Sequence, residues 1–120
     1  AGRCGGPAMR RPSLDRLVAV AGAMRDRDLA ALRAAGKARE ETRALISAID
    51  PAAAASDDDP AAQVNALRYR LWAEGRRRDL NIALARQTAD WLNCRAAAAQ
   101  SFGKAAVLEA MRAKPPLRRD

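Results

Sequence analysis

Apolar residues recur along two long stretches of the chain with the spacing of helix faces. Residues 80–113 contain no Pro and a single Gly, and their apolar positions share about a third of a turn at 3.6 residues per turn. The positions on this arc are Leu84, Trp91, Leu92, Ala99, Phe102, Ala106 and Ala110. An amphipathic helix gains most of its stability by burying its apolar face, so the arc is predicted to pack against another helix.

Residues 14–49 are the candidate partner. A heptad pattern over them is apolar at both ends and small or polar in the middle. Its a positions are Leu14, Ala21, Asp28, Ala35, Thr42 and Ile49, and its d positions are Leu17, Met24, Ala31, Ala38 and Leu45. Three further apolar residues flank this seam at e: Val18, Leu32 and Ile46. Asp28 either fixes the register of the two helices or marks an offset of the partner helix, and we favour the offset.

Capping residues indicate where the two helices begin and end. Ser13 is a good N-cap, and Pro51 disfavours helix at Asp50. Asp59 before Pro60 is a typical helix start, so the last carboxylate of the Asp57–Asp59 run has a capping role. We therefore predict helices at 13–50 and 60–113, a connector at 51–59, a disordered tail at 1–12 and a basic tail at 115–120. The second helix is expected to continue through Gly75.

These patterns predict an all-α fold, a long antiparallel two-helix coiled-coil hairpin. At about 1.5 Å per residue the first helix is about 56 Å long and the second about 80 Å. If pairing starts at the connector and the second helix is straight, its turns beyond residue 98 have no partner, and Phe102, Val107 and Leu108 are exposed for docking or self-association. A bend near Gly75 would instead match residues 80–113 to the first helix.

Composition limits the classes of function. The 120 residues are 49% apolar but only 3% aromatic, which suits a narrow helix–helix seam rather than a thick core. The net charge of +8 comes almost entirely from Arg, and it indicates either an anionic partner or a coding bias that enriches Ala and Arg together. Two distant Cys, no His and no membrane-length apolar run favour a reducing cytoplasm. Met9 is a natural translation start, so residues 1–8 are expected to precede the native chain.

No residue constellation predicts catalysis, a cofactor or a metal ion. The chain lacks His, a phosphate-binding Gly-rich loop and a nucleophile elbow, so we expect no enzyme activity. Three consecutive cations, Arg76, Arg77 and Arg78, are a candidate anion-binding or acidic-partner patch, or else a solvated helix face. Tyr69 and Trp72 are candidate partner contacts near the connector.

The layout as a whole resembles a known family. A first helix with Leu14-Asp15-Arg16-Leu17 is followed by a brief connector and a longer Arg- and Ala-rich helix. The second helix carries Arg86-Gln87, Trp91, Lys104 and Val107-Leu108-Glu109-Ala110-Met111. Over residues 14–114 this arrangement is similar to the stalk protein of the type III and flagellar export ATPase, the FliJ/YscO family. The chain is shorter, richer in Ala and Arg, and poorer in Lys, Glu and Gln than is typical of that family.

The resemblance implies a non-enzymatic bacterial accessory protein that enters the export ATPase hexamer and promotes its assembly and protein export. It also implies contacts with the export gate or escort chaperones, and a cytoplasmic location at the membrane export apparatus without membrane insertion. Residues 14–24 with 96–111 would enter the ring, and Arg76–Arg78 would remain outside. Two alternatives stay open: a basic helical module that binds nucleic acid, and a structural helix pair completed by an unknown protein partner. The sequence does not determine whether the chain dimerises.

Overall fold

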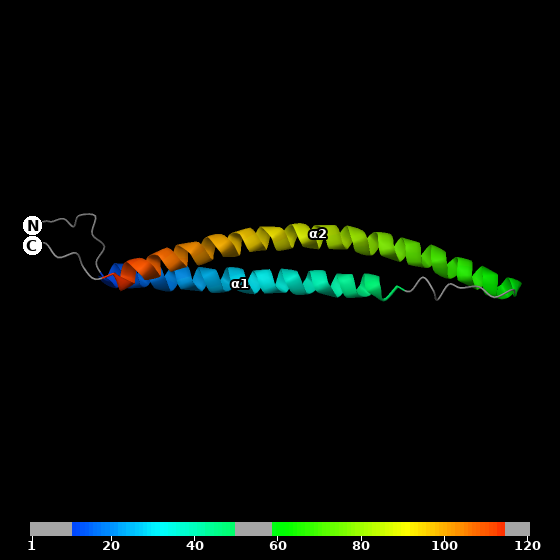
Figure 1. The fold of residues 1–120 in the computed structure, drawn as a ribbon, viewed down its shortest axis with the longest axis horizontal. Helices are drawn as coiled ribbons and strands as arrows, with labels where there is room; N and C mark the ends of the chain where they lie inside the picture. The colour runs from blue at the N-terminus through cyan, green and yellow to red at the C-terminus, as the bar shows by residue number, and fades with distance from the viewer. Residues whose placement is uncertain (1–10, 50–58, 115–120) are drawn as a thin grey trace, which may run out of the picture. The chain divides into compact units, whose positions relative to one another are not determined.

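The fold is an all-α helical hairpin. The computed structural model describes residues 11–49 and 59–114, and these residues form two helices and no strand. Helix α1 spans Arg11–Ser47, and helix α2 spans Pro60–Ala113 (Figure 1). As the sequence predicted, α2 runs through Gly75 without a break, because one Gly costs a helix interior only about 1 kcal/mol.

The cap of α2 is the one that the sequence predicts. Asp59 Oδ1 accepts a hydrogen bond from the backbone N–H of Ala61 at 3.1 Å, and the carbonyl oxygen of Asp59 accepts one from Gln63 at 3.0 Å. The carboxylate thus satisfies an N–H group that has no partner within the helix. Pro60 follows as the first helical residue, where a missing N–H costs nothing.

The bounds of α1 differ from the predicted ones by two residues at its start and three at its end. The helix begins at Arg11 rather than after a Ser13 cap, because Pro12 fits a first helical turn, in which its missing N–H is not needed. It ends at Ser47 rather than Asp50, and a turn closed by Ile49 N–H and the Ile46 carbonyl at 3.1 Å follows. Most of the tail and connector predictions, at 1–10, 50–58 and 115–120, lie outside the described residues.

The chain divides into two units, and each contains part of both helices. The terminal unit comprises Ala1–Leu32 and Asn93–Asp120, and the connector unit comprises Arg33–Leu92. In the terminal unit Asp28 lies beside Ser101, and Asp15 lies 4.0 Å from Arg112, so earlier residues of α1 meet later residues of α2.

The connector unit has the same antiparallel order. Arg39 is bonded to Thr88, and further along α1 Ile49 packs in one apolar cluster with Ala73 and Leu80. The antiparallel arrangement of the hairpin is therefore present in each unit.

Burial along α1 confirms one of the two predicted heptad rows. The a row faces α2, with Leu14, Thr42 and Ile49 buried. The second buried row is the e row, with Val18 and Ile46 among others, which the sequence placed at the flank of the seam, whereas the predicted d residues Leu17, Met24 and Leu45 are exposed. The pattern could not separate these rows, because apolar residues occupy both: Leu17-Val18 and Leu45-Ile46.

The predicted apolar arc of α2 is mostly not the face that meets α1. Leu84 and Trp91 are half-buried, but the rest of that arc is exposed. The exposed members are Leu92, Ala99, Phe102, Ala106 and Ala110. The buried or half-buried positions instead recur at alternating spacings of three and four, which is the repeat of a coiled coil. They are Ala73, Arg77, Leu80, Leu84, Gln87, Trp91, Cys94, Ala98, Ser101, Ala105 and Leu108.

The predicted C-terminal overhang of α2 was wrong. Arg112, near the end of α2, reaches Asp15 in the second turn of α1, so the last turns of α2 have a partner. Leu108 is half-buried and faces α1, whereas Phe102 and Val107 are exposed because they lie on other sides of α2. Tyr69 is the first residue of α2 that packs on the Ile49 cluster, so the extra length of α2 lies at its beginning.

Candidate interaction surfaces

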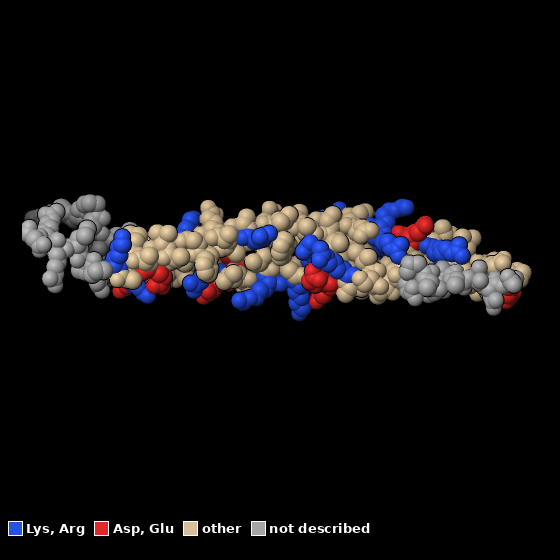
Figure 2. All heavy atoms as spheres, viewed as in Figure 1, with Lys and Arg blue, Asp and Glu red and all other residues tan. Residues whose placement is uncertain are grey.

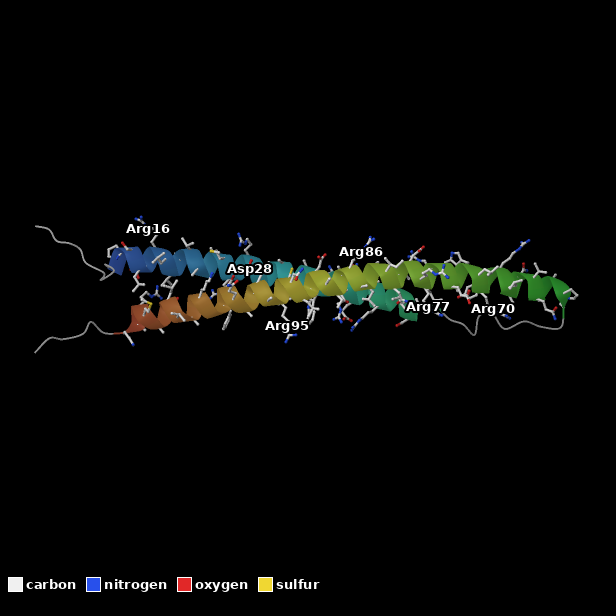
Figure 3. The ribbon with its side chains drawn as sticks, turned by 90° about the horizontal axis from the view of Figure 1, so that it is seen from above. Arg16, Asp28, Arg70, Arg77, Arg86 and Arg95 are labelled. Carbon is white, nitrogen blue, oxygen red and sulfur yellow. The ribbon has the colours of Figure 1, made fainter. Side chains whose placement is uncertain are left out.

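The seam of the terminal unit contains a charged residue with a specific partner. Figure 3 marks the position of Asp28 on α1. The Ser101 hydroxyl donates a hydrogen bond to Asp28 Oδ2, and Arg27 Nε lies 3.4 Å from Asp28 Oδ1. The hydrogen bond from Ser101, followed by the charge of Arg27, lowers the pKa of Asp28, although partial burial opposes the shift. Our preferred sequence interpretation, a helix offset at Asp28, is therefore wrong, because the carboxylate is paired across the seam.

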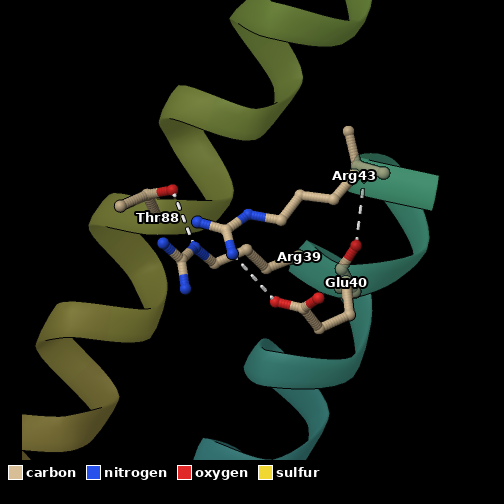
Figure 4. A network of polar contacts seen from close by, with 6 residues as sticks. Arg39, Glu40, Arg43 and Thr88 are labelled. Carbon is tan, nitrogen blue, oxygen red and sulfur yellow. Dashed lines mark hydrogen bonds and ion pairs between the residues drawn. The ribbon is translucent and has the colours of Figure 1, made fainter. Parts of the chain in front are cut away.

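The seam of the connector unit is organised around one Arg and one Trp. Arg39 Nε donates to Thr88 Oγ1 at 3.1 Å (Figure 4). The guanidinium carbon of Arg39 lies 4.9 Å from the ring centroid of Trp91. A cation over an indole face is attracted by the ring quadrupole. A Cβ on Gly36 would lie 3.5 Å from Trp91 Nε1, which is ordinary van der Waals contact, so the indole packs beside this position of α1. Trp91 is thus a seam residue, as predicted.

Gln87 is a weak point of the same seam. Its Oε1 atom is buried and has no hydrogen-bond partner among the described residues. A buried acceptor that loses water without gaining a donor costs about 1–3 kcal/mol. An apolar residue at position 87 would therefore make the connector unit more stable.

An apolar groove runs between the helices of the terminal unit. Helix α1 lines the groove with Leu17, Val20, Ala21 and Met24, and helix α2 lines it with Ser101, Lys104 and Leu108. Leu17, Val20 and Met24 are 39%, 52% and 41% exposed. Of the lining residues, the sequence singled out only Leu108 as a candidate for docking, and it did not predict a groove between the helices. The signal was present in the wholly apolar d row, which we assigned to the hairpin seam instead.

The predicted basic cluster lies on α2 in the connector unit. Arg76 and Arg78 are exposed, and Arg77 is half-buried. Arg77 and Arg78 line a shallow hollow together with Glu74. Elsewhere, on the face drawn in Figure 2, Lys and Arg side chains are scattered, and acidic side chains lie next to several of them. The described residues therefore include a local basic cluster, and the face drawn in Figure 2 carries mixed charges.

The remaining candidate residues differ in exposure. Tyr69 is half-buried against the Ile49 cluster, while Trp72 is 58% exposed, with the two ring centroids 5.7 Å apart. Phe102 and Val107 are 58% and 60% exposed, in the terminal unit. The candidates thus do not form one site: they lie on several sides of α2 and in both units.

The described residues contain no group of three or more His, Cys, Asp or Glu side chains placed to hold a metal ion. Neither of the two described helices has the length and apolar character needed to cross a membrane. What the described surface offers is an apolar groove, a basic cluster and exposed apolar side chains.

Comparison of the chain with protein-family models, with characterised proteins and with solved structures gives no match.

Proposed function

We propose that this chain is a non-enzymatic helical hairpin that acts by binding a protein, and that its partner is the hexameric ATPase of a bacterial flagellar or type III export system. The open groove of the terminal unit is the observation that supports this proposal most. Leu17, Val20 and Met24 stay accessible on one flank of α1, and burying apolar surface of this kind contributes about 25 cal/mol per Å². A partner that covers the groove therefore gains affinity.

The specific partner follows from the resemblance to export ATPase stalk proteins. In that arrangement the end of the hairpin that contains both chain termini enters the ATPase ring. The groove belongs to the terminal unit, which is formed by that end of α1 and α2. The export gate and escort chaperones are further proposed partners, and the proposed location is the bacterial cytoplasm at the export apparatus.

The exposed charges support contacts that depend on salt. Arg76 and Arg78 in the connector unit can approach acidic faces of a partner without a deep pocket. Electrostatic contacts of this kind assist the encounter of two proteins and weaken as ionic strength rises.

The test adds the purified chain to the cognate export ATPase and measures ATP turnover and co-elution at low and at high salt. The proposal expects faster turnover and co-elution at low salt, and a smaller effect at high salt. The absence of both effects at low salt rejects the ATPase as the partner.

A nucleic-acid-binding module is the second candidate, and the pair Arg77 and Arg78 at one hollow is the observation that favours it. Each phosphate contact adds to the salt dependence of nucleic-acid binding. The same preparation is therefore titrated with duplex and single-stranded nucleic acid. Tight binding with a steep salt slope, reduced in Arg77→Gln/Arg78→Gln, favours this second function. The third candidate, a helix pair completed by another protein, predicts that neither titration gives binding.

A further inference from the structure

One side of α2 is apolar although it does not face α1. The residues at alternating spacings of three and four on this side define the outer face of α2. In the terminal unit they are Ala96, Ala99, Gly103, Ala106, Ala110 and Ala113, and in the connector unit they are Ile82, Ala85, Ala89 and Leu92. All of them are exposed, and none is polar. The same 3–4 repeat marks the buried seam of α2, so this helix carries two coiled-coil faces and the hairpin uses one of them.

The large exposed apolar residues of α2 also gather on and beside this side. In coiled-coil terms the outer face supplies the a and d positions, with Ile82 at a and Leu92 at d. Phe102 and Leu67 fall at the flanking g positions, and Val107 and Trp72 fall at the flanking e positions. All four flanking residues are more than half exposed. Helices that associate through an a/d face bring g and e residues of the two chains together.

We propose that the outer face of α2 pairs in parallel and in register with the outer face of α2 in a second copy of this chain. In a parallel pair each g residue meets the e residue five positions later on the other helix. This rule joins Phe102 with Val107 in the terminal unit, and Leu67 with Trp72 in the connector unit. It also joins Glu109 with Lys114, a pair of opposite charge.

The opposite orientation does not match these flanking residues. An antiparallel pair centred on the same ten residues brings Phe102 near Thr88 and Arg95, and Val107 near Arg86 and Asn93. Each exposed apolar flank would then meet a polar one. Before Ile82 the parallel pair also contains unfavourable contacts: Glu74 meets Asp79, and Arg68 at a and Arg78 at d each meet their own copy. The favourable matches on the outer face itself are therefore those of residues 82–114.

Gly103 is consistent with close approach of two helices. A Cβ built on Gly103 meets no atom within 4 Å, so packing inside the described hairpin does not require a glycine there. Small residues along a helix face let the partner backbone come near, and the Ala residues of the outer face do the same. Because such a face buries modest area per residue, Ile82, Leu92 and the flanking Phe102–Val107 pair are expected to supply most of the affinity.

Light scattering after gel filtration measures whether the dimer exists. The chain has a mass of 12.9 kDa, and the proposal expects twice that mass at micromolar concentration. Ala99→Glu/Ala106→Glu places two carboxylates on the outer face and is expected to raise the dimer dissociation constant by about 100-fold or more. The matched control, Ala23→Glu/Ala30→Glu, makes the same changes at exposed positions of α1 and should leave the dimer intact.

Single-cysteine variants measure the orientation. In a background with Cys4→Ala and Cys94→Ala, either Ala85→Cys or Ala106→Cys alone is expected to form an interchain disulfide, because in-register pairing places each residue beside its own copy. If the interchain disulfide forms only when the Ala85→Cys variant is mixed with an Ala110→Cys variant, the dimer is antiparallel and the proposal is overturned. A monomeric wild type, or equal dissociation by the test and control variants, also overturns it. If the chain is monomeric and instead binds a different protein through Ala99 and Ala106, the outer face of α2 is not covered by a second copy, and the proposal is overturned.

Discussion

Asp28 on α1 and Ser101 on α2 are joined by a hydrogen bond across the seam of the terminal unit. The pair ties the position of one helix to that of the other. A polar residue in a helix–helix seam can fix register in this way, because a shift along the helix axis separates the carboxylate from its donor. The otherwise small residues near this level of the seam, Ala98 and Ala105, allow many registers.

The first prediction concerns pH. The pKa of Asp28 is lowered in the folded chain, so the carboxylate stabilises the fold fully above its unfolded pKa, and this stabilisation is lost as pH falls through the folded pKa. Urea unfolding should therefore show a larger fall in stability between about pH 6 and about pH 3 for the wild type than for Asp28→Asn. Asp26→Asn, at an exposed neighbouring carboxylate, is the control and should keep most of the wild-type slope. Identical slopes for all three proteins would contradict a stabilising Asp28–Ser101 pair.

The second prediction concerns Gly36. A Cβ at this position would lie 3.5 Å and 3.6 Å from Trp91 Nε1 and Cδ1, which is ordinary contact. Gly36→Ala should therefore raise the free energy of unfolding by about 0.5–1 kcal/mol, the gain in helix propensity. Gly36→Leu should lower it, because the larger side chain competes with the indole for the same space. Chemical denaturation followed by circular dichroism measures both, and a destabilised Gly36→Ala protein would show that Trp91 packs more closely than described.

The third prediction concerns Gln87. Replacing it with Leu removes a buried acceptor that has no described partner and adds apolar area to the seam, so the free energy of unfolding should rise by about 1–2 kcal/mol. Gln100→Leu, at an exposed position of α2, is the matched control and should change stability by less than about 0.5 kcal/mol. A Gln87→Leu protein that is less stable than the wild type would mean that the amide makes a hydrogen bond that stabilises the hairpin.

Periodicity and capping predicted the two helices and their antiparallel pairing. Asp59 and Pro60 predicted the start of α2, because an N-cap acceptor followed by Pro at the first helical position is typical of a helix N-terminus. The a row of α1 was also predictable, since Leu14 and Ile49 bracket a repeat of seven. These features depend on residues near one another in sequence.

The register and the working face of α2 could not be predicted in the same way. Ala occurs on most sides of α2, so its apolar pattern did not select one seam, and the exposed Phe102 looked like core. The overhang prediction failed because it assumed that pairing starts at the connector, whereas Arg112 meets Asp15 at the other end of the pair. Such choices depend on contacts between helices, which a single helical pattern does not contain.

The same ambiguity hid the groove of the terminal unit. Leu17 and Met24 were assigned to the hairpin seam because their row is wholly apolar, and Val20 was not assigned at all. The structure uses Val18 in the seam and leaves Leu17 outside it. Two adjacent apolar rows on one helix are typical of a helix that packs on two neighbours, so the pattern fits a helix that contacts both α2 and a partner.

The most direct test of the proposed function measures how the export ATPase responds to a groove variant. Val20→Asp/Met24→Asp places charges in the groove, and Ala23→Asp/Ala30→Asp places the same charges at exposed positions of α1 outside it. ATP turnover is followed as each folded protein is titrated into the ATPase at low salt. We expect the control to stimulate turnover as the wild type does, and the groove variant to need about 100-fold more protein for the same effect. Equal stimulation by the two variants would contradict the groove as the binding surface, and no stimulation by the wild type would contradict the proposed function itself.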